Sequence, residues 1–288
     1  MTALSDQPSS DALYQVIGLP AFADNYIWLL ETLADLPNSG PRSLAVVDPG
    51  DAAPVIAYCR QHHAVPTHIL LTHHHADHTG GVAEIVAWVH HTYSDQTIQV
   101  LGPQTEEIAG VSDPLLGGEK RMLFPGVLLE VIAMPGHTRG HLAYFIAGHP
   151  PANPPALFSG DVLFGLGCGR LFEGTATQMY ATLARIKLLP DTTRIYCAHE
   201  YTLMNLPFAL AVDPKNLALQ QRAAQIHALR NAGQPTVPLT LAEERQTNPF
   251  LRSELAALAE SVCAAQGASS CEVFAALRKM RDTYQAPR

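Results

Sequence analysis

The sequence predicts an α/β domain followed by a smaller helical domain. Up to about residue 200, short runs of β-branched and aromatic residues that end in Gly, Pro or Asp alternate with helical patterns. Beyond that residue, helix-capping signals replace the strand-like runs. The apolar fraction of 47% is typical of a chain with a packed core. We therefore expect a disordered tail over residues 1–12, an α/β domain over 13–199 and a helical domain over 200–288.

Nine runs are predicted as strands because they are short and are bounded by turn residues. They are 14–20, 25–32, 43–50, 67–73, 96–102, 128–136, 141–148, 156–164 and 193–200. Two helices are expected between them. One carries Val82, Ile85, Val86 and Val89 on a single face, and the other follows Thr175.

Four capping signals predict where helices begin in the C-terminal part. They are Asp213 with Pro214, Thr240 with Glu243, Asn248 with Pro249, and Ser269 with Glu272. The helix after Asp213 is expected to run to about residues 231–233, and the helix after Ser269 to about residue 284.

Histidine is unevenly distributed, because nine of the 14 histidines lie between residues 62 and 91. The segment T-H-H-H-A-D-H at 72–78 follows a predicted strand and precedes a predicted helix. His73 and His75 share parity and can project to one point, while Asp77 and His78 can point to a neighbouring position. Imidazole and carboxylate are ligands that Zn²⁺ accepts. Four such ligands in one loop are more than a single tetrahedral ion with an open coordination position needs.

Three further residues of ligand type end predicted strands: His137, Asp161 and His199. The carboxyl ends of strands are where α/β folds place their sites. Seven ligands suffice for two metal ions if one carboxylate bridges them. We expect His74 to point away from the metals, whereas His141 either orients a ligand or simply packs. The remaining histidines read as surface or core residues.

These segments resemble the metallo-β-lactamase superfamily, through T-H-H-H-A-D-H, P-G-H-T-R-G-H, F-S-G-D and C-A-H-E. Within it the chain is similar to the glyoxalase II (hydroxyacylglutathione hydrolase) family. That closer resemblance rests on D-N-Y at 24–26, G-C-G-R-L-F-E-G at 167–174, H-E-Y-T at 199–202 and N-P-F at 248–250. It extends from about Tyr14 to the C-terminus.

The resemblance implies an αββα sandwich over residues 13–199 and an α-helical substrate-binding domain over 200–288. It implies a binuclear site with two divalent ions. The first ion is bound by His73, His75 and His137, the second by Asp77, His78 and His199, and Asp161 bridges them. Asp77 and Asp161 are the implied catalytic residues. Zn²⁺ is the expected metal, with Fe and Mn as alternatives.

The implied reaction is hydrolysis of the thioester S-D-lactoylglutathione to D-lactate and glutathione, a step of methylglyoxal detoxification. Hydroxide that bridges the two metals attacks the thioester carbonyl. The family's glutathione-binding positions correspond to Arg170, Phe172, Tyr201, Arg278 and Arg281. Many relatives have Tyr at position 172, so Phe172 removes one hydroxyl donor to the substrate. Some relatives have Lys at position 281.

Chemistry read from the residues agrees with this reaction. The chain has no G-x-S-x-G nucleophile elbow. Water between two metals would have its pKa lowered from 15.7 toward ~7, and a thiol pKa of ~8.5 makes the thiolate a good leaving group. Asp77 is also a candidate proton acceptor. Cys168 lies between two glycines and is interpreted as a packed small residue, because no base is tied to it.

Arg278 and Arg281 lie three residues apart and share one helix face. Arginine binds carboxylates in a bidentate manner, and glutathione carries two of them. Spacing alone also fits a solvated basic helix end, which the helix dipole favours. The family resemblance favours the substrate-binding interpretation.

Other activities of the superfamily stay open at this point: β-lactamase, lactonase, persulfide dioxygenase and RNase Z-type nuclease. The net charge of −8 argues against nucleic acid as a partner. Seven ligands argue against a mononuclear iron dioxygenase. A non-catalytic metal-binding module is the non-enzyme alternative, and the intact ligand set argues against it.

The expected location is the cytoplasm. The five cysteines are widely spread and form no C-x-x-C pair, which fits a reducing compartment. No secretory signal is recognisable at the N-terminus, and this argues against a periplasmic β-lactamase. No apolar run approaches the ~18 residues of a membrane helix. We expect a monomer that acts on a small molecule, with no nucleic acid or membrane partner.

Overall fold

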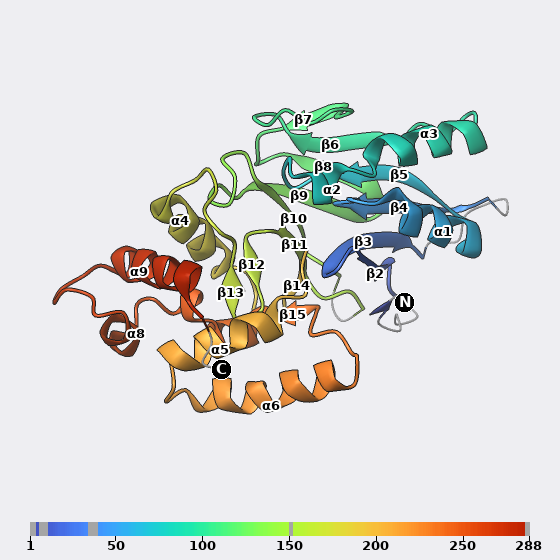
Figure 1. The fold of residues 1–288 in the computed structure, drawn as a ribbon. Coiled ribbons are helices and arrows are strands. Elements are labelled where there is room, and N and C mark those ends of the chain that lie inside the picture. The colour runs from blue at the N-terminus through green and yellow to red at the C-terminus, as the bar shows by residue number, and fades with distance from the viewer. Residues whose placement is uncertain (1–3, 6–10, 34–39, 150–151, 286–288) are drawn as a thin grey trace. The chain divides into compact units, whose positions relative to one another are not determined.

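The computed structural model describes residues 4–5, 11–33, 40–149 and 152–285 (Figure 1). The chain divides into two compact units. Unit 1 comprises Met1–Ala133 and Gly140–Gly160, and unit 2 comprises Met134–Arg139 and Asp161–Arg288. The domain boundary near residue 200 stays a prediction.

Unit 1 contains a seven-stranded sheet, and its strands lie in the order of the chain. They are β1 (Leu4–Ser5), β2 (Tyr14–Ala21), β3 (Asn25–Thr32), β4 (Arg42–Val47), β5 (Ala64–Leu70), β6 (Gln99–Pro103) and β7 (Asp113–Leu115). Strands β1 to β4 pair in antiparallel fashion, whereas β4 to β7 are parallel. The carboxyl ends of β4, β5 and β6 therefore meet at one edge of the sheet.

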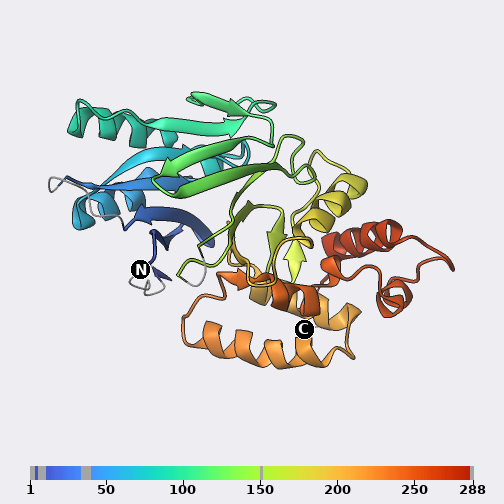
Figure 2. The same cartoon turned by 180° about the vertical axis from the view of Figure 1, so that it is seen from behind.

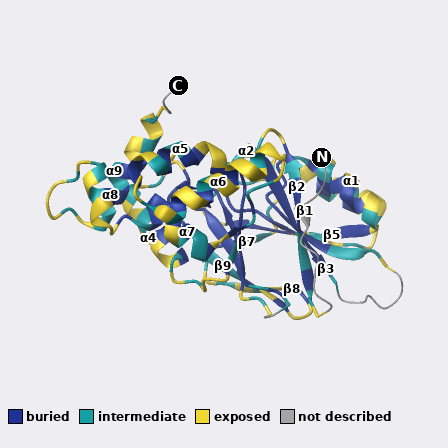
Figure 3. Cartoon of the chain, turned by 90° about the horizontal axis from the view of Figure 1, so that it is seen from below, coloured by how far each residue is buried: buried dark blue, intermediate teal, exposed yellow. Residues whose placement is uncertain are grey.

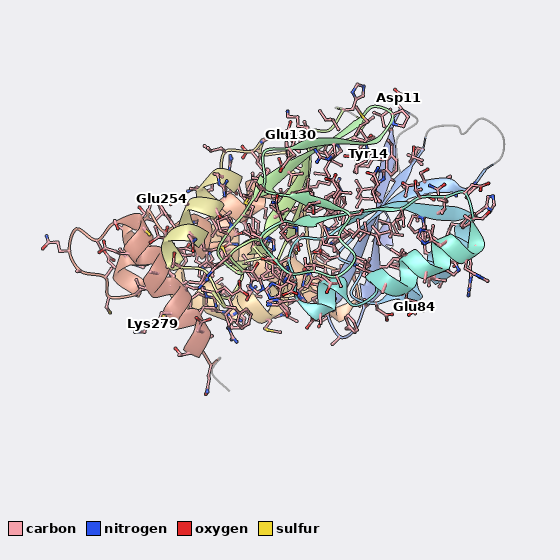
Figure 4. All side chains as sticks on the ribbon, turned by 90° about the horizontal axis from the view of Figure 1, so that it is seen from above. Asp11, Tyr14, Glu84, Glu130, Glu254 and Lys279 are labelled. Carbon is pink, nitrogen blue, oxygen red and sulfur yellow. The ribbon has the colours of Figure 1, made fainter. Side chains whose placement is uncertain are left out.

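Helices α1 (Ala52–His62) and α3 (Val82–Thr92) link the parallel strands. Both belong to one hydrophobic cluster with the sheet, through residues such as Val55 and Ile85. On α3 the exposed side chain of Glu84 points away from the sheet (Figure 4). The helix predicted from Val82, Ile85, Val86 and Val89 is confirmed. Val86 is half-buried, and the other three side chains are buried. A short helix, α2 (Ala76–Thr79), precedes α3.

A second, antiparallel set of strands completes unit 1 (Figure 2). In spatial order these strands are β11 (Ala156–Gly160), β10 (Leu142–Ile146), β9 (Val127–Ala133) and β8 (Lys120–Phe124). The hydroxyl of Tyr144 on β10 donates to the carbonyl of Leu71 at 2.6 Å, which links this set to the end of β5. All eight residues of β3 are buried, as expected of a strand that is covered on both faces. Figure 3 shows the strands of unit 1 largely in the colour of buried residues.

Unit 2 is mainly helical. Its short strands are β12 (Leu163–Phe164), β13 (Gly167–Cys168), β14 (Arg194–Cys197) and β15 (Leu239–Thr240). Its helices are α4 (Ala176–Ile186), α5 (Thr202–Val212), α6 (Leu217–Asn231), α7 (Leu241–Thr247), the 3₁₀ helix η1 (Pro249–Leu251), α8 (Ala256–Ser261) and α9 (Ser270–Thr283). Strands β12 and β13 form a hairpin, and β14 pairs with β15.

An aromatic cluster forms part of the core of unit 2. The rings of Phe208, Phe250 and Phe274, from α5, η1 and α9, lie with successive centroids 5.9 Å apart. Lys279, on the opposite side of α9, points to solvent (Figure 4). The capping box of Ser269 and Glu272 is formed, so the predicted start of the last helix is confirmed.

A buried polar network joins α6 and α7 to the β12–β13 hairpin. The Glu244 carboxylate is fully buried, and it pairs with the guanidinium of Arg222, of which 4% is exposed. Its other oxygen accepts hydrogen bonds from the backbone N–H of Leu166 at 3.0 Å and from Asn248 Nδ2 at 2.9 Å. Asn248 Nδ2 also lies 3.0 Å from the carbonyl of Gly167. The tip of the hairpin is therefore tied to the helices through groups that have no access to water.

Two capping predictions were wrong. Helix α6 begins after Asn216, whose side chain accepts from the N–H of Leu219 at 3.2 Å. Asp213 instead ends α5 and holds Asn216 Nδ2 at 2.9 Å. Thr240 is the N-cap of α7 as predicted, but its side chain makes no capping bond, so the predicted capping box is not formed.

The nine predicted strand runs all contain strands, and the run 156–164 contains two. Sequence reasoning missed β1, β7, β8, β13 and β15, which have two to five residues each. Most of the predicted disordered tail, residues 1–3 and 6–10, lies outside the described residues. The structure differs from that prediction at Leu4–Ser5, which pair with Gly18 and Ile17 on the edge of the sheet. Within the described ranges no helix combines the length and apolar character needed to cross a membrane.

Removal of the Glu244 side chain should destabilise the protein strongly, because the buried Arg222 would lose its buried partner. We expect Glu244→Ala to lower the free energy of unfolding by about 3 kcal/mol. The matched control is Glu243→Ala, which removes a carboxylate that is 40% exposed and lies 3.1 Å from the same guanidinium. The control should cost about 1 kcal/mol or less. Urea unfolding of both variants measures the difference, and equal losses would contradict a stabilising role for the buried pair.

Candidate functional site

The seven predicted metal ligands fall into two groups, one in each unit. Unit 1 contains His73, His75, Asp77 and His78, and unit 2 contains His137, Asp161 and His199. In both, the ligand-type side chains follow strands or short turns, and within each group they lie close together.

The unit 1 group begins directly after β5. His73 Nε2 lies 2.9 Å from His75 Nδ1, and the rings of His73 and His78 have centroids 4.1 Å apart. His75 precedes α2, so Asp77 lies on the first turn of that helix and His78 follows it. Asp77 Oδ2 lies 3.5 Å from His78 Nε2 and accepts a hydrogen bond from Asn25 Nδ2 at 3.0 Å. All four side chains are thus gathered at the carboxyl end of β5.

Asp48 follows β4 and supports this group through hydrogen bonds. It was missed in the sequence analysis. Its buried carboxylate accepts from the backbone N–H and the hydroxyl of Thr72, at 2.8 and 2.7 Å. Its Oδ2 also lies 3.0 Å from His78 Nδ1. A carboxylate on one ring nitrogen of a histidine fixes the ring so that the other nitrogen can bind a metal. The run S-L-A-V-V-D ends on a carboxylate just as other predicted strands end on ligands, and that pattern was a usable signal.

Two histidines near this group, His74 and His141, are not predicted ligands and have different surroundings. His74 contacts Glu106 through both its backbone N–H, at 2.7 Å, and its Nδ1, at 2.9 Å. Glu106 also accepts a hydrogen bond from the backbone N–H of Gly140 at 3.0 Å. It therefore joins the segment that follows β5 to the segment that precedes β10. His141 is fully buried and stacks on His73 with centroids 4.9 Å apart. A stacked contact is compatible with both predicted roles of His141, orienting a ligand and packing.

The unit 2 group centres on Asp161. Its Oδ2 lies 3.3 Å from His137 Nε2, and its Oδ1 lies 3.4 Å from His199 Nε2. His137 Nδ1 lies 2.8 Å from the carbonyl of Arg170, which leaves Nε2 directed at the carboxylate. Gly169 lets the chain approach closely here, since a Cβ at that position would come within 1.9 Å of the Asp161 carbonyl oxygen. One carboxylate therefore faces a different histidine with each of its oxygens.

The donor chemistry of both groups fits a divalent cation. Two nitrogen or oxygen ligands of one tetrahedral zinc ion, each about 2.0–2.1 Å from it, lie about 3.3 Å apart. The distances from Asp161 to its two histidines, 3.3 and 3.4 Å, agree with this spacing. A carboxylate with one oxygen toward each of two histidines has the arrangement that a bridge between two ions requires.

A pocket of about 270 Å³ lies within unit 2, beside Asp161 and His137. All five predicted substrate-binding residues line it: Arg170, Phe172, Tyr201, Arg278 and Arg281. The Tyr201 ring stacks on that of His199 with centroids 4.6 Å apart. The Phe172 ring meets that of His137 edge-on and is 59% exposed. The pocket thus joins ligand-type residues, aromatic rings and three guanidinium groups.

Two of the pocket's arginines, Arg278 and Arg281, have different partners. Arg278 donates through Nη1 to the carbonyl of Cys168 at 2.8 Å and through Nη2 to Asp282 at 2.9 Å. Arg281 contacts the Asn205 amide oxygen, with its Nη2 at 3.2 Å. Burial and the nearby Arg278 guanidinium lower the pKa of Arg281 from its ordinary value. Asp282 and Asn205 were both missed in the sequence analysis. The i, i+4 spacing of Arg278 and Asp282 was a usable signal, whereas no local pattern marks Asn205.

Cys168 is a packed residue, as the sequence analysis proposed. It is buried, and burial raises the pKa of its thiol, although the Arg278 guanidinium acts in the opposite direction. A raised pKa decreases the thiolate fraction at neutral pH, and the thiolate is the nucleophilic form. Its Sγ lies 3.7 Å from Arg278 Nη1 and contributes to packing in the hairpin.

Alkylation should distinguish the buried cysteines from the exposed one. At pH 8, iodoacetamide should label Cys263, which is exposed, and should leave Cys168 and Cys59 unmodified in the folded protein. Burial raises the pKa of Cys59 to about 12, so its thiol stays protonated at that pH. Mass spectrometry of the labelled peptides measures the pattern, with denatured protein as the control in which all cysteines react. Rapid labelling of Cys168 in the folded protein would contradict this assignment.

Two family models match the chain. The metallo-beta-lactamase superfamily model matches residues 38–199, and the model described as hydroxyacylglutathione hydrolase C-terminus matches residues 200–284. The hydroxyacylglutathione hydrolase of Dechloromonas aromatica is 50% identical and covers 94% of this chain and 100% of the relative. That of Halorhodospira halophila is 48% identical, over 92% of this chain and 97% of the relative.

Solved structures share the fold. The crystal structure of ETHE1 from Myxococcus xanthus is similar with a TM-score of 0.58 at 20% sequence identity, covering 99% of this chain and 93% of that one. A metallo-beta-lactamase from Staphylococcus aureus gives a TM-score of 0.54 at 20% identity, over 89% and 67% of the two chains. At this identity the similarity concerns the fold alone. The predicted metallo-β-lactamase fold with a C-terminal helical domain is confirmed.

Proposed function

Because the chain belongs to the hydroxyacylglutathione hydrolase family of the metallo-β-lactamase superfamily, we propose that it hydrolyses S-D-lactoylglutathione to D-lactate and glutathione. The observation that supports this most directly is the unit 2 pocket. It combines the Asp161 carboxylate, which faces His137 and His199, with three arginines that suit the carboxylates of glutathione. Divalent metal ions are the cofactors that the family and the His/Asp groups support.

Seven side chains are proposed to hold two ions. His73, His75 and His137 would bind one ion, Asp77, His78 and His199 the other, and Asp161 would bridge them. The support comes from inside each unit, where ligand-type atoms lie 2.9 to 3.5 Å apart and Asp48 and the Arg170 carbonyl orient imidazole rings. We propose Zn²⁺ as the metal, and Fe or Mn are the alternatives that this donor set also accepts.

Bound divalent ions would supply two functions, an attacking water whose pKa falls from 15.7 toward ~7 and polarisation of the thioester carbonyl. The chain's own residues supply the rest. Asp77 is proposed to accept a proton, and the Asn25 amide donates to its Oδ2 at 3.0 Å and so orients it. The glutathione thiolate departs without a general acid, because a thiol pKa of ~8.5 makes it a good leaving group.

The glutathione part of the substrate is proposed to bind in the unit 2 pocket. Arg170, Arg278 and Arg281 would meet its carboxylates, while Tyr201 and Phe172 would contact its backbone. Phe172 offers only its ring face, so the peptide hydrogen bond that a tyrosine would make at this position is absent. The partner class is therefore a small anionic thioester, and the net charge of −8 argues against nucleic acid.

A monomer in the cytoplasm is the proposed state of the protein. All five cysteines are free thiols, which suits a reducing compartment. Size-exclusion chromatography with light scattering tests the monomer, and fractionation of cells tests the location.

The purified protein should hydrolyse S-D-lactoylglutathione and should contain about two metal ions per chain. Loss of thioester absorbance measures the rate, and elemental analysis of the same sample measures the metals. A chelator should abolish turnover, and Zn, Fe or Mn should restore it. Two bound metals without turnover after each reconstitution would refute the substrate and leave the metal proposal standing.

Substitution of the bridging carboxylate should impair metal binding and catalysis together. We expect Asp161→Asn to lower kcat by about 100-fold or more and to reduce the metal content below that of the unmodified protein. The matched control is Asp191→Asn in the same unit, whose carboxylate is 64% exposed and pairs with Arg245. Turnover and metal content of the control should be unchanged. An Asp161→Asn protein with full activity would exclude the bridging role.

Loss of the Asp48 carboxylate should weaken metal binding although Asp48 is not a proposed ligand. Its contact with His78 fixes that ring, and such supporting groups contribute about 10–100-fold in metal affinity. We expect that loss in Asp48→Ala, measured by competition with a chromogenic chelator. Asp51→Ala is the control, because Asp51 caps α1 and should affect stability by about 1 kcal/mol without a change in metal affinity. Equal affinities in both variants would contradict the supporting role.

A further inference from the structure

An acidic side chain outside the lining of the unit 2 pocket pairs with two of the pocket's arginines. Asp282 lies one turn beyond Arg278 on α9, and its Oδ1 accepts from Arg278 Nη2 at 2.9 Å. The same oxygen lies 3.5 Å from Nε of Arg170, which comes from the segment after the β12–β13 hairpin. In the part of the chain that the structure describes, Asp282 is the carboxylate that forms an ion pair with Arg170. One oxygen therefore serves two of the three arginines.

These two arginines differ in how firmly the rest of unit 2 holds them. Arg278 is 6% exposed, donates to the Cys168 carbonyl at 2.8 Å and lies with its guanidinium 5.2 Å from the centre of the Phe250 ring. Arg170 has a side chain that is 59% exposed, and its guanidinium lies 5.9 Å from the centre of the Phe172 ring. A long, exposed side chain loses much conformational entropy when a ligand orders it. Asp282 restrains Arg170 before the ligand arrives.

We propose that Asp282 is a positioning residue that holds Arg170 and Arg278 in place for a carboxylate of the glutathione part of the substrate. The inference rests on the proposed function and adds a residue that assembles its anion site. Asp282 acts through the arginines and not on the thioester, so it affects substrate binding and not the chemical step.

Binding that is equal in the ground state and the transition state changes KM and leaves kcat unaltered. We therefore expect Asp282→Ala to raise KM for S-D-lactoylglutathione about tenfold, with kcat within about twofold of the unmodified enzyme. Asp282→Asn keeps an oxygen acceptor for Arg278 and should give a smaller rise. A thioester without carboxylates, S-lactoyl-N-acetylcysteamine, should be hydrolysed equally well by all three proteins, because it makes no use of the arginines.

The matched control is Glu254→Gln, which removes a carboxylate outside the pocket. The Glu254 side chain is 49% exposed and pairs with Lys187 at 2.8 Å. Its KM and kcat should equal those of the unmodified enzyme. A double variant, Asp282→Ala with Arg170→Ala, separates positioning from a general effect on the fold. If Asp282 acts through Arg170, the rise in KM of the double variant should be smaller than the product of the rises in the two single variants.

Calorimetric titration with S-methylglutathione makes the inference testable apart from turnover. Weaker binding by the Asp282 variants, with metal content and thermal unfolding unchanged, is the expected result. Unchanged or tighter binding would overturn the inference, since tighter binding would make Asp282 a competitor of the ligand. Binding by the unmodified protein without hydrolysis of S-D-lactoylglutathione would refute the proposed function alone, whereas absence of binding would refute both.

Discussion

The hydrogen bonds of the buried Asp48 carboxylate are the interaction on which the unit 1 ligand group depends. They reach Thr72 and His78, which are 24 and 30 residues away along the chain. A buried carboxylate without partners is costly, so its contacts draw the ends of the neighbouring parallel strands β4 and β5 together with helix α2. The loop that carries four proposed metal ligands is thus shaped by a residue that is not a ligand itself.

In unit 2, too, buried polar side chains that are not proposed metal ligands hold the segment next to a proposed ligand. Glu244 and Asn248 satisfy backbone groups of the β12–β13 hairpin, and Arg278 donates to the carbonyl of Cys168 in that hairpin. The carbonyl of Arg170, two residues further on, lies 2.8 Å from His137 Nδ1. One short segment therefore orients a proposed metal ligand through its backbone and presents a guanidinium group through its side chain. The proposed substrate-binding group and the proposed metal ligand are therefore held by the same segment.

Local signals predicted the elements that local forces determine. The 3.6-residue period placed α3, the capping box placed α9, and ligand-type residues at strand ends identified the seven candidates. The predictions were wrong where contacts between residues distant in the sequence determine the local structure. Asp213 and Asn216 are both good caps, but Asn216 also donates to the carbonyl of Gln246 at 2.9 Å, and Arg252 lies 3.4 Å from Asp213. Asp48 lies near the end of a predicted strand and Asp282 lies four residues after Arg278, so both carried a local signal. Their contacts with His78 and Arg170 come from distant parts of the chain and could not be read from the sequence.

Arg278 and Arg281 illustrate how the fold distinguishes residues that the sequence presents as equivalent. Their spacing places both on one face of α9, yet Arg278 pairs with a carboxylate and Arg281 with the neutral amide of Asn205. An amide orients a guanidinium group and leaves its charge intact, whereas a carboxylate compensates part of it. The attraction for an anion in this pocket therefore depends on the partner of each arginine as much as on the number of arginines.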